Sequence, residues 1–301
     1  MSIGRFAPSP SGPLHAGSLV AALASHASIR ARQGRFTVRI DDLDTARVVP
    51  GADTAILDCL RRFALIDDAT PVVRQSERRS AYHAALHTLA RADRLYRCTC
   101  SRRTLAGHAV YPGTCRAQAI SPARLQDRLA ATDGRDDAAL RARLHGELHV
   151  SDAVQGERHR LLERDVGDVI VLRRDGVIAW PLATAVDDAA PNTEVVRGAD
   201  LFDPTPAQIG LMQALQLAVP RYAHVPVLCD GAGRKLGKQT RAPALDADRA
   251  LGLLQRAWAF LGQPPLEADS VQRFHAQTPL HWSIARVPAV AQRHDPRLVP
   301  S

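Results

Sequence analysis

The stretch RFAPSPSGPLHAGS, residues 5–18, joins a short strand to a helix through a loop rich in proline and glycine. Residues 3–7 are typical of a strand, and the prolines of the loop exclude both a helix interior and a central strand. Apolar side chains then recur at helical spacing over residues 17–31, and residues 35–40 alternate as a second strand. This strand–loop–helix–strand order predicts an α/β fold with a parallel sheet.

Two candidate ligand-binding segments follow these two strands. One is the Pro/Ser loop, and the other is the acidic run DDLD at residues 41–44. Parallel sheets bind ligands at the carboxyl ends of their strands, so we expect both segments at one site. In the loop, Gly12 and Gly17 let the backbone approach a ligand closely, and the helix start after His15 offers free N–H groups to an anion. The alternative is a proline-rich turn with a surface histidine.

The rest of the chain alternates between helix and strand patterns, except for one segment of different composition. Residues 97–164 carry three of the five cysteines and few long apolar runs, which indicates an inserted subdomain. Ser76 is expected to cap a helix, and Thr205-Pro206 to open another. The expected helices are 52–63, 77–95, 205–217 and 248–261, and the expected strands are 168–173 and 225–228, with a further α/β signal at 176–185.

Composition places the chain among ordinary soluble proteins. It has 301 residues, 46% hydrophobic and 23% charged, which suits about two domains and excludes a disordered chain or a fibre. No run approaches the roughly 20 apolar residues that span a bilayer, and the first ten residues lack a signal core. Five cysteines, an odd number, argue against a disulfide framework, so we expect a reducing cytoplasm.

The charge balance points to a polyanionic partner. The net charge is +8, which indicates nucleic acid, although an arginine-rich genome would give the same bias. Of 39 basic residues only two are lysines, Lys235 and Lys238, and both lie in a glycine-rich loop after an apolar strand. Two mobile ammonium groups can clamp a triphosphate, while a basic surface turn is the alternative.

Four elements together resemble the class I glutamyl-tRNA synthetases. They are residues 5–18, RIDDLD at 39–44, VRGADL at 196–201 and KLGKQ at 235–239, in the order of that family. The resemblance implies a Rossmann-type parallel-sheet catalytic domain built from residues 1–96 and 165–240. It also implies an inserted zinc-binding subdomain at 97–164 and a short helical C-terminal region at 241–301, without an anticodon-binding domain.

The short C-terminal region and the cysteines narrow the resemblance to the truncated paralogs, the glutamyl-Q tRNA(Asp) synthetases. That implies a cytoplasmic enzyme with a reaction of two steps: tRNA-independent activation of glutamate with ATP and Mg²⁺, then transfer of glutamate to the queuosine base in the anticodon of tRNA(Asp). We expect a monomer with no membrane contact, whose RNA partner is the anticodon stem-loop. The alternatives are a short glutamyl-tRNA synthetase that charges a tRNA 3′ end and a catalytically silent tRNA-binding paralog.

The resemblance also assigns site residues. It implies that Arg5 and Arg197 bind the side-chain carboxylate of glutamate, a pairing that suits the arginine fork. For each of these two arginines, a structural ion pair is the alternative role. The implied glutamate-binding residues are Arg5, Ser9, Asp41, Trp180 and Arg197. The implied ATP-binding residues are Pro8, Gly12, His15, Gly17, Ser18, Lys235 and Lys238, and the catalytic ones are His15, Lys235 and Lys238.

Three positions depart from the family pattern. Asp41 stands where the family has glutamate, so its contact with the α-ammonium group must be closer or bridged by water, and Asp42 is a less favoured substitute. Trp180 replaces a tyrosine, and Gly237 replaces a serine in the lysine loop. None of these changes removes a charge, so the prediction of an enzyme stands.

Three cysteines within 18 residues, Cys98, Cys100 and Cys115, favour zinc over a disulfide in a reducing compartment. A closed structural site needs a fourth ligand. Donor chemistry alone favours His108, whereas the resemblance favours Tyr111. We expect one structural zinc on Cys98, Cys100, Tyr111 and Cys115; three free cysteines are the alternative. Cys59 and Cys229 are expected in the core.

Overall fold

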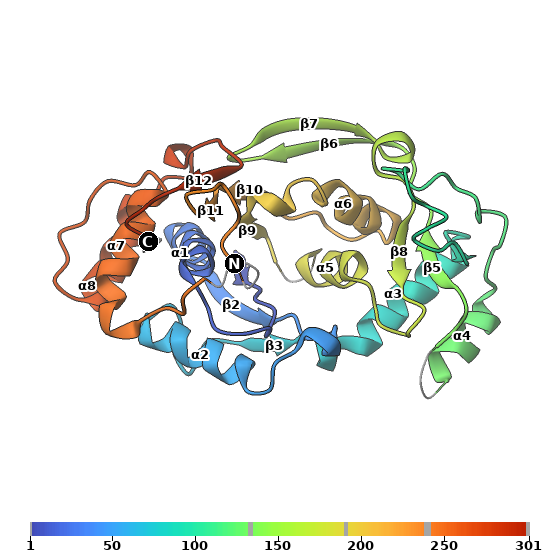
Figure 1. The fold of residues 1–301 in the computed structure, drawn as a ribbon, viewed down its shortest axis with the longest axis horizontal. Coiled ribbons are helices and arrows are strands. Elements are labelled where there is room, and N and C mark those ends of the chain that lie inside the picture. Colours follow the sequence, from blue (N-terminus) through green and yellow to red (C-terminus); the bar gives the residue numbers. More distant parts are fainter. Residues whose placement is uncertain (1, 132–134, 190–191, 238–241, 299–301) are drawn as a thin grey trace.

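The computed structural model describes residues 2–131, 135–189, 192–237 and 242–298. Its centre is a seven-stranded sheet in the order β3–β2–β1–β9–β10–β6–β7, parallel except for the β6–β7 hairpin (Figure 1). The predicted α/β fold with a parallel-dominated sheet is therefore confirmed. The strands are β1 Ile3–Phe6, β2 Arg35–Ile40, β3 Val72–Arg74, β6 Glu147–Asp152, β7 Gly156–Leu161, β9 Glu194–Gly198 and β10 Arg221–Val225.

Helices cover both faces of this sheet, because successive side chains of each strand point to opposite faces. In β9, Val196 joins the core that includes α1, while its neighbour Val195 joins the core on the other face. The first face carries α1 Ala16–Ala31, α2 Ala52–Arg62, α7 Ala250–Phe260 and α8 Val271–His281; the second carries α3 Arg79–Arg91, α5 Trp180–Ala189 and α6 Thr205–Ala214.

A smaller antiparallel sheet stands beside the main one, in the order β4–β5–β8. Its strands are β4 Leu95–Cys98, β5 Ala139–Ala142 and β8 Val169–Leu172, and α4 Pro122–Ala130 packs against α3. The strand expected at 168–173 therefore exists but does not belong to the main sheet. The hairpin β6–β7 from the same part of the chain instead pairs with β10 and extends the main sheet.

Several expected boundaries are wrong for local reasons. The helix expected over 77–95 ends at Arg91, because Asp93 adopts a left-handed conformation (φ 51°), and β4 follows. Ser76 is not its N-cap: it lies in a 3₁₀ turn, where its backbone N–H and hydroxyl donate to the Asp42 carboxylate at 2.8 and 2.7 Å. The strand expected at 225–228 is interrupted at Pro226, which has no N–H to pair.

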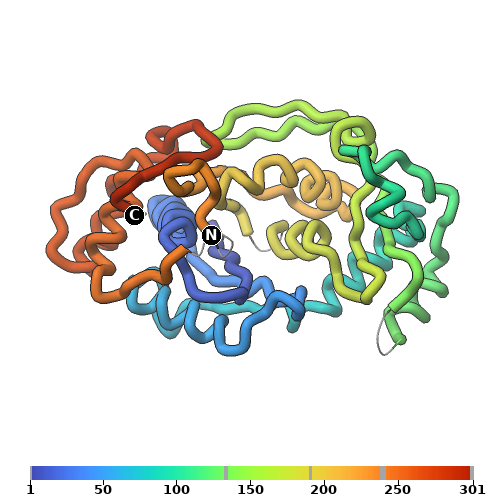
Figure 2. The backbone as a smooth tube through the Cα atoms, viewed as in Figure 1, coloured from blue at the N-terminus to red at the C-terminus, as the bar shows by residue number. Residues whose placement is uncertain are grey.

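The C-terminal region folds back onto the first helix of the chain. Helices α7 and α8 pack against α1, with Trp258 buried between them. The last described strand, β12 Gln292–His294, pairs in parallel with β11 Val227–Cys229, so residues 292–294 lie beside the segment that leads to the lysine loop (Figure 2). Within the described ranges, every helix is too short or too polar to cross a bilayer.

Candidate active site

A cavity of about 460 Å³ opens where β1, β9 and β10 end and α1 begins. Arg5, Ser9, His15, Gly17, Ser18, Asp41, Trp180, Arg197 and Lys235, all predicted site residues, line it. Two further predicted residues do not line it: Pro8 is buried within the loop, and Gly12 lies in the turn with a φ of 144°. Lys238 lies outside the described residues, so its position stays a prediction.

Strand parity places three arginines on one face of the sheet. Arg5 is on β1, Arg39 on β2 and Arg197 on β9, and these strands are neighbours in the order β2–β1–β9. Their chain neighbours Phe6, Ile40 and Val196 point to the opposite face, into the core around α1. Each arginine is only 4 to 5% exposed. Three guanidinium groups under one helix, α5, require buried negative charge nearby.

Asp188 of α5 supplies that charge and is fully buried. Arg5 donates to both carboxylate oxygens, from Nε at 3.0 Å and from Nη2 at 2.9 Å, and Arg39 Nη1 donates at 2.6 Å. The nearest Arg197 nitrogen lies 3.6 Å away. Burial alone would raise the pKa of Asp188, but the arginines outweigh burial and hold the pKa well below its usual range.

Arg197 is held on its other side by neutral groups. Its Nη2 donates to Thr205 Oγ1 at 2.8 Å and to Gln208 Oε1 at 2.6 Å, and its Nε lies 3.0 Å from His224 Nε2. Burial lowers the pKa of Arg197 to about 10, against the charge of Asp188, so the group remains a cation at neutral pH. Fixed in this way, Arg197 can offer the N–H groups of Nη1, which lies 3.6 Å from the nearest Asp188 oxygen, to a carboxylate.

Asp41 lines the cavity and is also paired with the guanidinium group of Arg39. Arg39 donates to the two Asp41 oxygens at 2.6 and 3.2 Å, and the Asp41 side chain is 8% exposed. Burial raises the pKa of Asp41 although Arg39 opposes the shift. Asp42, the less favoured substitute, lies outside the cavity lining and is engaged by Ser76.

His15 is the N-cap of α1. Its Nδ1 accepts the backbone N–H of Ser18 at 3.3 Å, which leaves the ring proton on Nε2 when the imidazole is neutral. Burial, and then the charge of Lys235, lower the pKa of His15, so the neutral form dominates at neutral pH. Gly17 lets the ring pack closely: a Cβ there would lie 3.1 Å from two ring atoms, so the imidazole would have to shift. The cap thus fixes an Nε2–H donor at a helix N-terminus.

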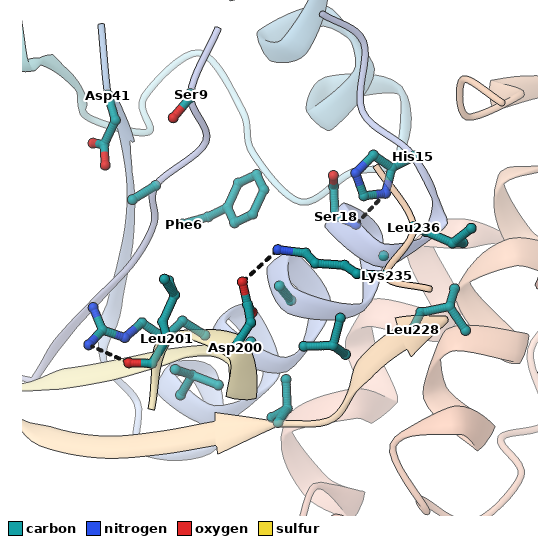
Figure 3. A pocket seen from close by; sticks show the side chains of 18 of the residues that line it. Phe6, Ser9, His15, Ser18, Asp41, Asp200, Leu201, Leu228, Lys235 and Leu236 are labelled. Atoms are coloured by element: carbon teal, nitrogen blue, oxygen red, sulfur yellow. Dashed lines mark hydrogen bonds and ion pairs between the residues drawn. The ribbon is translucent and has the colours of Figure 1, made fainter. Parts of the chain in front are cut away.

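Lys235 crosses the cavity to reach Asp200. Its Nζ lies 2.5 Å from Asp200 Oδ2, and Figure 3 shows this pair between the His15 side and the Ser9–Asp41 side of the cavity. Asp200 folds over Gly198, where a Cβ would lie only 2.5 Å from Asp200 Oδ1. The side chain of Lys235 is 57% exposed and that of Asp200 35%, so this ion pair remains accessible to a ligand.

Sequence reasoning missed four charged residues of this site: Arg39, Asp187, Asp188 and Asp200. Two signals were available. Arg39 stands at an inward position of an apolar strand, and two adjacent aspartates interrupt the apolar helix α5. Asp187 accepts hydrogen bonds from Gln75, Tyr82 and Arg78, and thereby closes the base of the cluster.

The sulfurs of Cys98, Cys100 and Cys115 gather in a second group, with all three within 4.8 Å of one another. The Tyr111 hydroxyl lies 3.5 Å from Cys98 Sγ and 3.8 Å from Cys100 Sγ, and it accepts the backbone N–H of Cys115 at 2.9 Å. Three thiols and a phenol oxygen around one point make a donor set that fits a tetrahedral metal such as zinc. His108 is exposed and does not belong to this group.

Comparison with known proteins gives the relatives of the chain. The sequence model of the catalytic domain of class I tRNA synthetases (E and Q) matches residues 3–252. A protein named glutamyl-Q tRNA(Asp) synthetase from Pseudomonas aeruginosa is 46% identical, over 98% of each chain. Another of the same name, from Chromobacterium violaceum, is 43% identical over 95% of each chain.

A solved structure shares the fold. It is described as a glutamate tRNA ligase from Elizabethkingia meningosepticum in complex with its amino acid, and it superposes with a TM-score of 0.74 at 22% identity. The match covers 97% of the present chain but 66% of the other, so the present chain spans just under two thirds of that longer protein. The full-length match to the shorter relatives and the match to the domain model agree: the chain belongs to the class I tRNA synthetases for glutamate and glutamine, among the glutamyl-Q tRNA(Asp) synthetases.

Proposed function

We propose that this protein activates glutamate with ATP and transfers it to the queuosine base in the anticodon of tRNA(Asp). The observation that carries the proposal is the buried arginine cluster at the floor of a cavity whose other end holds His15 and Lys235. A dicarboxylic amino acid suits the first end and a polyphosphate suits the second. Family membership supports the same assignment.

In this proposal the glutamate side-chain carboxylate binds the N–H groups of Arg5 and Arg197 that remain beside their contacts with Asp188 and with the Val196 carbonyl. Both cations are already oriented by Asp188, so little side-chain ordering accompanies binding. Asp41 holds the α-ammonium group while it keeps its bond to Arg39. Ser9 and Trp180 border the remaining space, Ser9 as a hydrogen-bonding group and Trp180 as an aromatic wall at the start of α5.

ATP occupies the end of the cavity near the start of α1. The backbone at Gly17 and Ser18 and the Nε2–H of His15 face the phosphates, and Lys235 exchanges Asp200 for a phosphate oxygen. An oxygen of the glutamate α-carboxylate attacks the α-phosphorus, and the bond to the leaving pyrophosphate breaks. Lys238 is proposed to act in the same step. Mg²⁺, when bound to ATP, supplies neutralisation of the phosphate charge.

Transfer needs only a second nucleophile. A hydroxyl of the cyclopentene ring of queuosine attacks the adenylate carbonyl, AMP leaves, and the hydroxyl proton passes to solvent. Contacts to an RNA stem fall mainly on its shape and phosphates, which agrees with the net charge of +8. We propose that the insertion at residues 97–164 carries the zinc-binding subdomain, apart from the β6–β7 hairpin, which extends the main sheet. Cys98, Cys100, Tyr111 and Cys115 would hold zinc there, and zinc supplies a cross-link between these segments.

The test is glutamylation of purified tRNA(Asp) with and without queuosine, together with glutamate-dependent ATP–pyrophosphate exchange without RNA. We expect exchange in the absence of tRNA, and label only on the queuosine-containing tRNA. Label on a 3′-terminal ribose, or exchange that requires tRNA, would assign the chain as a short glutamyl-tRNA synthetase. Binding of tRNA with no exchange under any condition would indicate a catalytically silent paralog.

A further inference from the structure

The outward face of the β6–β7 hairpin brings two imidazoles and a carboxylate together, outside the cavity and outside the cysteine group. In the antiparallel register His149 lies directly opposite His159, and Glu147 precedes His149 by two residues on the same face. Leu148 and Val150, which alternate with them, are buried against the core. The three polar side chains therefore share a solvent-facing surface of the hairpin. Figure 1 shows this hairpin at the edge of the main sheet.

The donor atoms of the three side chains converge. The rings of His149 and His159 have centroids 4.7 Å apart. His149 Nε2 lies 4.0 Å from Glu147 Oε1, and the same oxygen is hydrogen bonded to His159 Nε2. One ligand atom from each residue lies within 4.8 Å of the other two. All three side chains are well exposed, at 75, 59 and 46% for His149, Glu147 and His159.

Two imidazole nitrogens and one carboxylate oxygen are a donor set for borderline divalent metals. Donors bound at about 2 Å to one tetrahedral ion stand about 3.3 Å apart, so the observed spacing needs only small rotations of side chains that are free to move. Glu147 and His159 are hydrogen bonded to each other, and a metal ion bound between them would replace that contact. Water can fill the remaining coordination positions on the open side.

We propose that Glu147, His149 and His159 form a binding site for a divalent transition metal such as Zn²⁺, Ni²⁺ or Cu²⁺. Because two ligands come from β6 and one from β7, the ion joins the two strands. β7 is an edge strand of the main sheet, bonded to β6 alone within it, so the ion restrains that edge. The site is independent of the proposed glutamate and ATP chemistry.

The probe is Ni²⁺, because it binds well to imidazole nitrogens and should not displace zinc from the thiolates of the cysteine group. The full chain, saturated with zinc and freed of excess metal, is titrated with Ni²⁺ by calorimetry. We expect one nickel ion per chain, with affinity at least tenfold lower in His149→Ala and in His159→Ala. Glu147→Gln should show a smaller loss. His145→Ala is the matched control, an exposed histidine of the same segment outside the group, and should bind like the wild type.

A spectroscopic measurement separates a real site from diffuse binding to surface histidines. Cu²⁺ bound to the wild type should give electron spin echo modulation from two equivalent imidazoles, and His159→Ala should leave one. The proposal is overturned if the wild type binds no more Ni²⁺ than the His149→Ala/His159→Ala double variant. An equal loss of Ni²⁺ affinity in His145→Ala and His149→Ala would overturn it as well. That result would mean that nickel binds diffusely to exposed histidines, and that Glu147 and His159 form only a surface ion pair. Matching thermal unfolding curves confirm that each variant is folded.

Discussion

Asp188 and Arg5 form a two-point ion pair across 183 residues of sequence, with distances of 3.0 Å from Nε to Oδ1 and 2.9 Å from Nη2 to Oδ2. Both side chains are buried, and the same carboxylate also receives Arg39. The pair therefore sets the orientation of a cation that is proposed to meet the substrate. Its removal should alter glutamate binding as well as stability.

Asp188→Asn should raise the KM for glutamate in the exchange reaction at least tenfold and change the KM for ATP less than threefold. An amide carries no charge and cannot accept from several guanidinium groups at both ends. Loss of a buried ion-pair partner should also lower Tm by roughly 10 °C. Asp58→Asn, which breaks only an exposed pair with Arg61, is the control. Equal rises in both KM values would contradict a role in glutamate binding.

Arg197→Lys should raise the KM for glutamate by about 10- to 100-fold while ATP binding stays near the wild type. Lysine keeps the charge, but its single ammonium group cannot donate to Thr205 and Gln208 and also reach a carboxylate where Nη1 of Arg197 lies. Steady-state exchange kinetics with each substrate varied in turn measure the effect. If the KM values for ATP and glutamate rise by the same factor, Arg197 has only a structural role.

Lys235→Ala should slow adenylate formation about 100-fold, because one fixed positive charge at a phosphate contributes on that order to a transition state. The free energy of unfolding should change by less than about 1 kcal/mol, since the lost ion pair is exposed. Asp200→Asn provides the comparison: it removes the competitor for Lys235 and should not raise the KM for ATP. Exchange at the wild-type rate in Lys235→Ala would exclude this lysine from the mechanism.

Metal analysis should find about one zinc per chain, and Cys115→Ser should abolish it. Tyr111→Phe should weaken zinc at least tenfold in competition with a chelator, because it removes the fourth donor near the three sulfurs. His108→Ala should have no effect. The reverse pattern, with loss in His108→Ala and none in Tyr111→Phe, would make the prediction of the fourth ligand wrong.

As the pH is lowered, glutamate binding should begin to weaken at a higher pH than it would if Asp41 had the pKa of an exposed aspartate. Burial raises the pKa of Asp41, so this carboxyl takes up its proton at a higher pH than a free one. Protonation removes the charge that is proposed to hold the α-ammonium group, and the KM for glutamate should rise as pH falls. The profile should flatten in Asp41→Asn, while the KM for ATP follows no such trend in either protein.

Patterns local in the chain were readable from the sequence. The proline loop, the helix over Ala16–Ala31 and the strand over Arg35–Ile40 depend on neighbours within a few residues, since prolines block regular structure and apolar spacing selects helix or strand. The close spacing of Cys98, Cys100 and Cys115 likewise fixed one group of donors within a short loop. These features needed no knowledge of how distant segments meet.

Partners distant in the chain were not readable in this way. Nothing local distinguishes an apolar strand of the main sheet from β8, which pairs with β5, because both expose the same backbone groups. In the same way, Asp188 reads as one more helical carboxylate until packing of α5 against the sheet brings it onto Arg5 and Arg39. Burial is the physical reason for this pairing, because three guanidinium groups removed from water require a carboxylate among them. Only the packing of the whole chain brings that carboxylate to them.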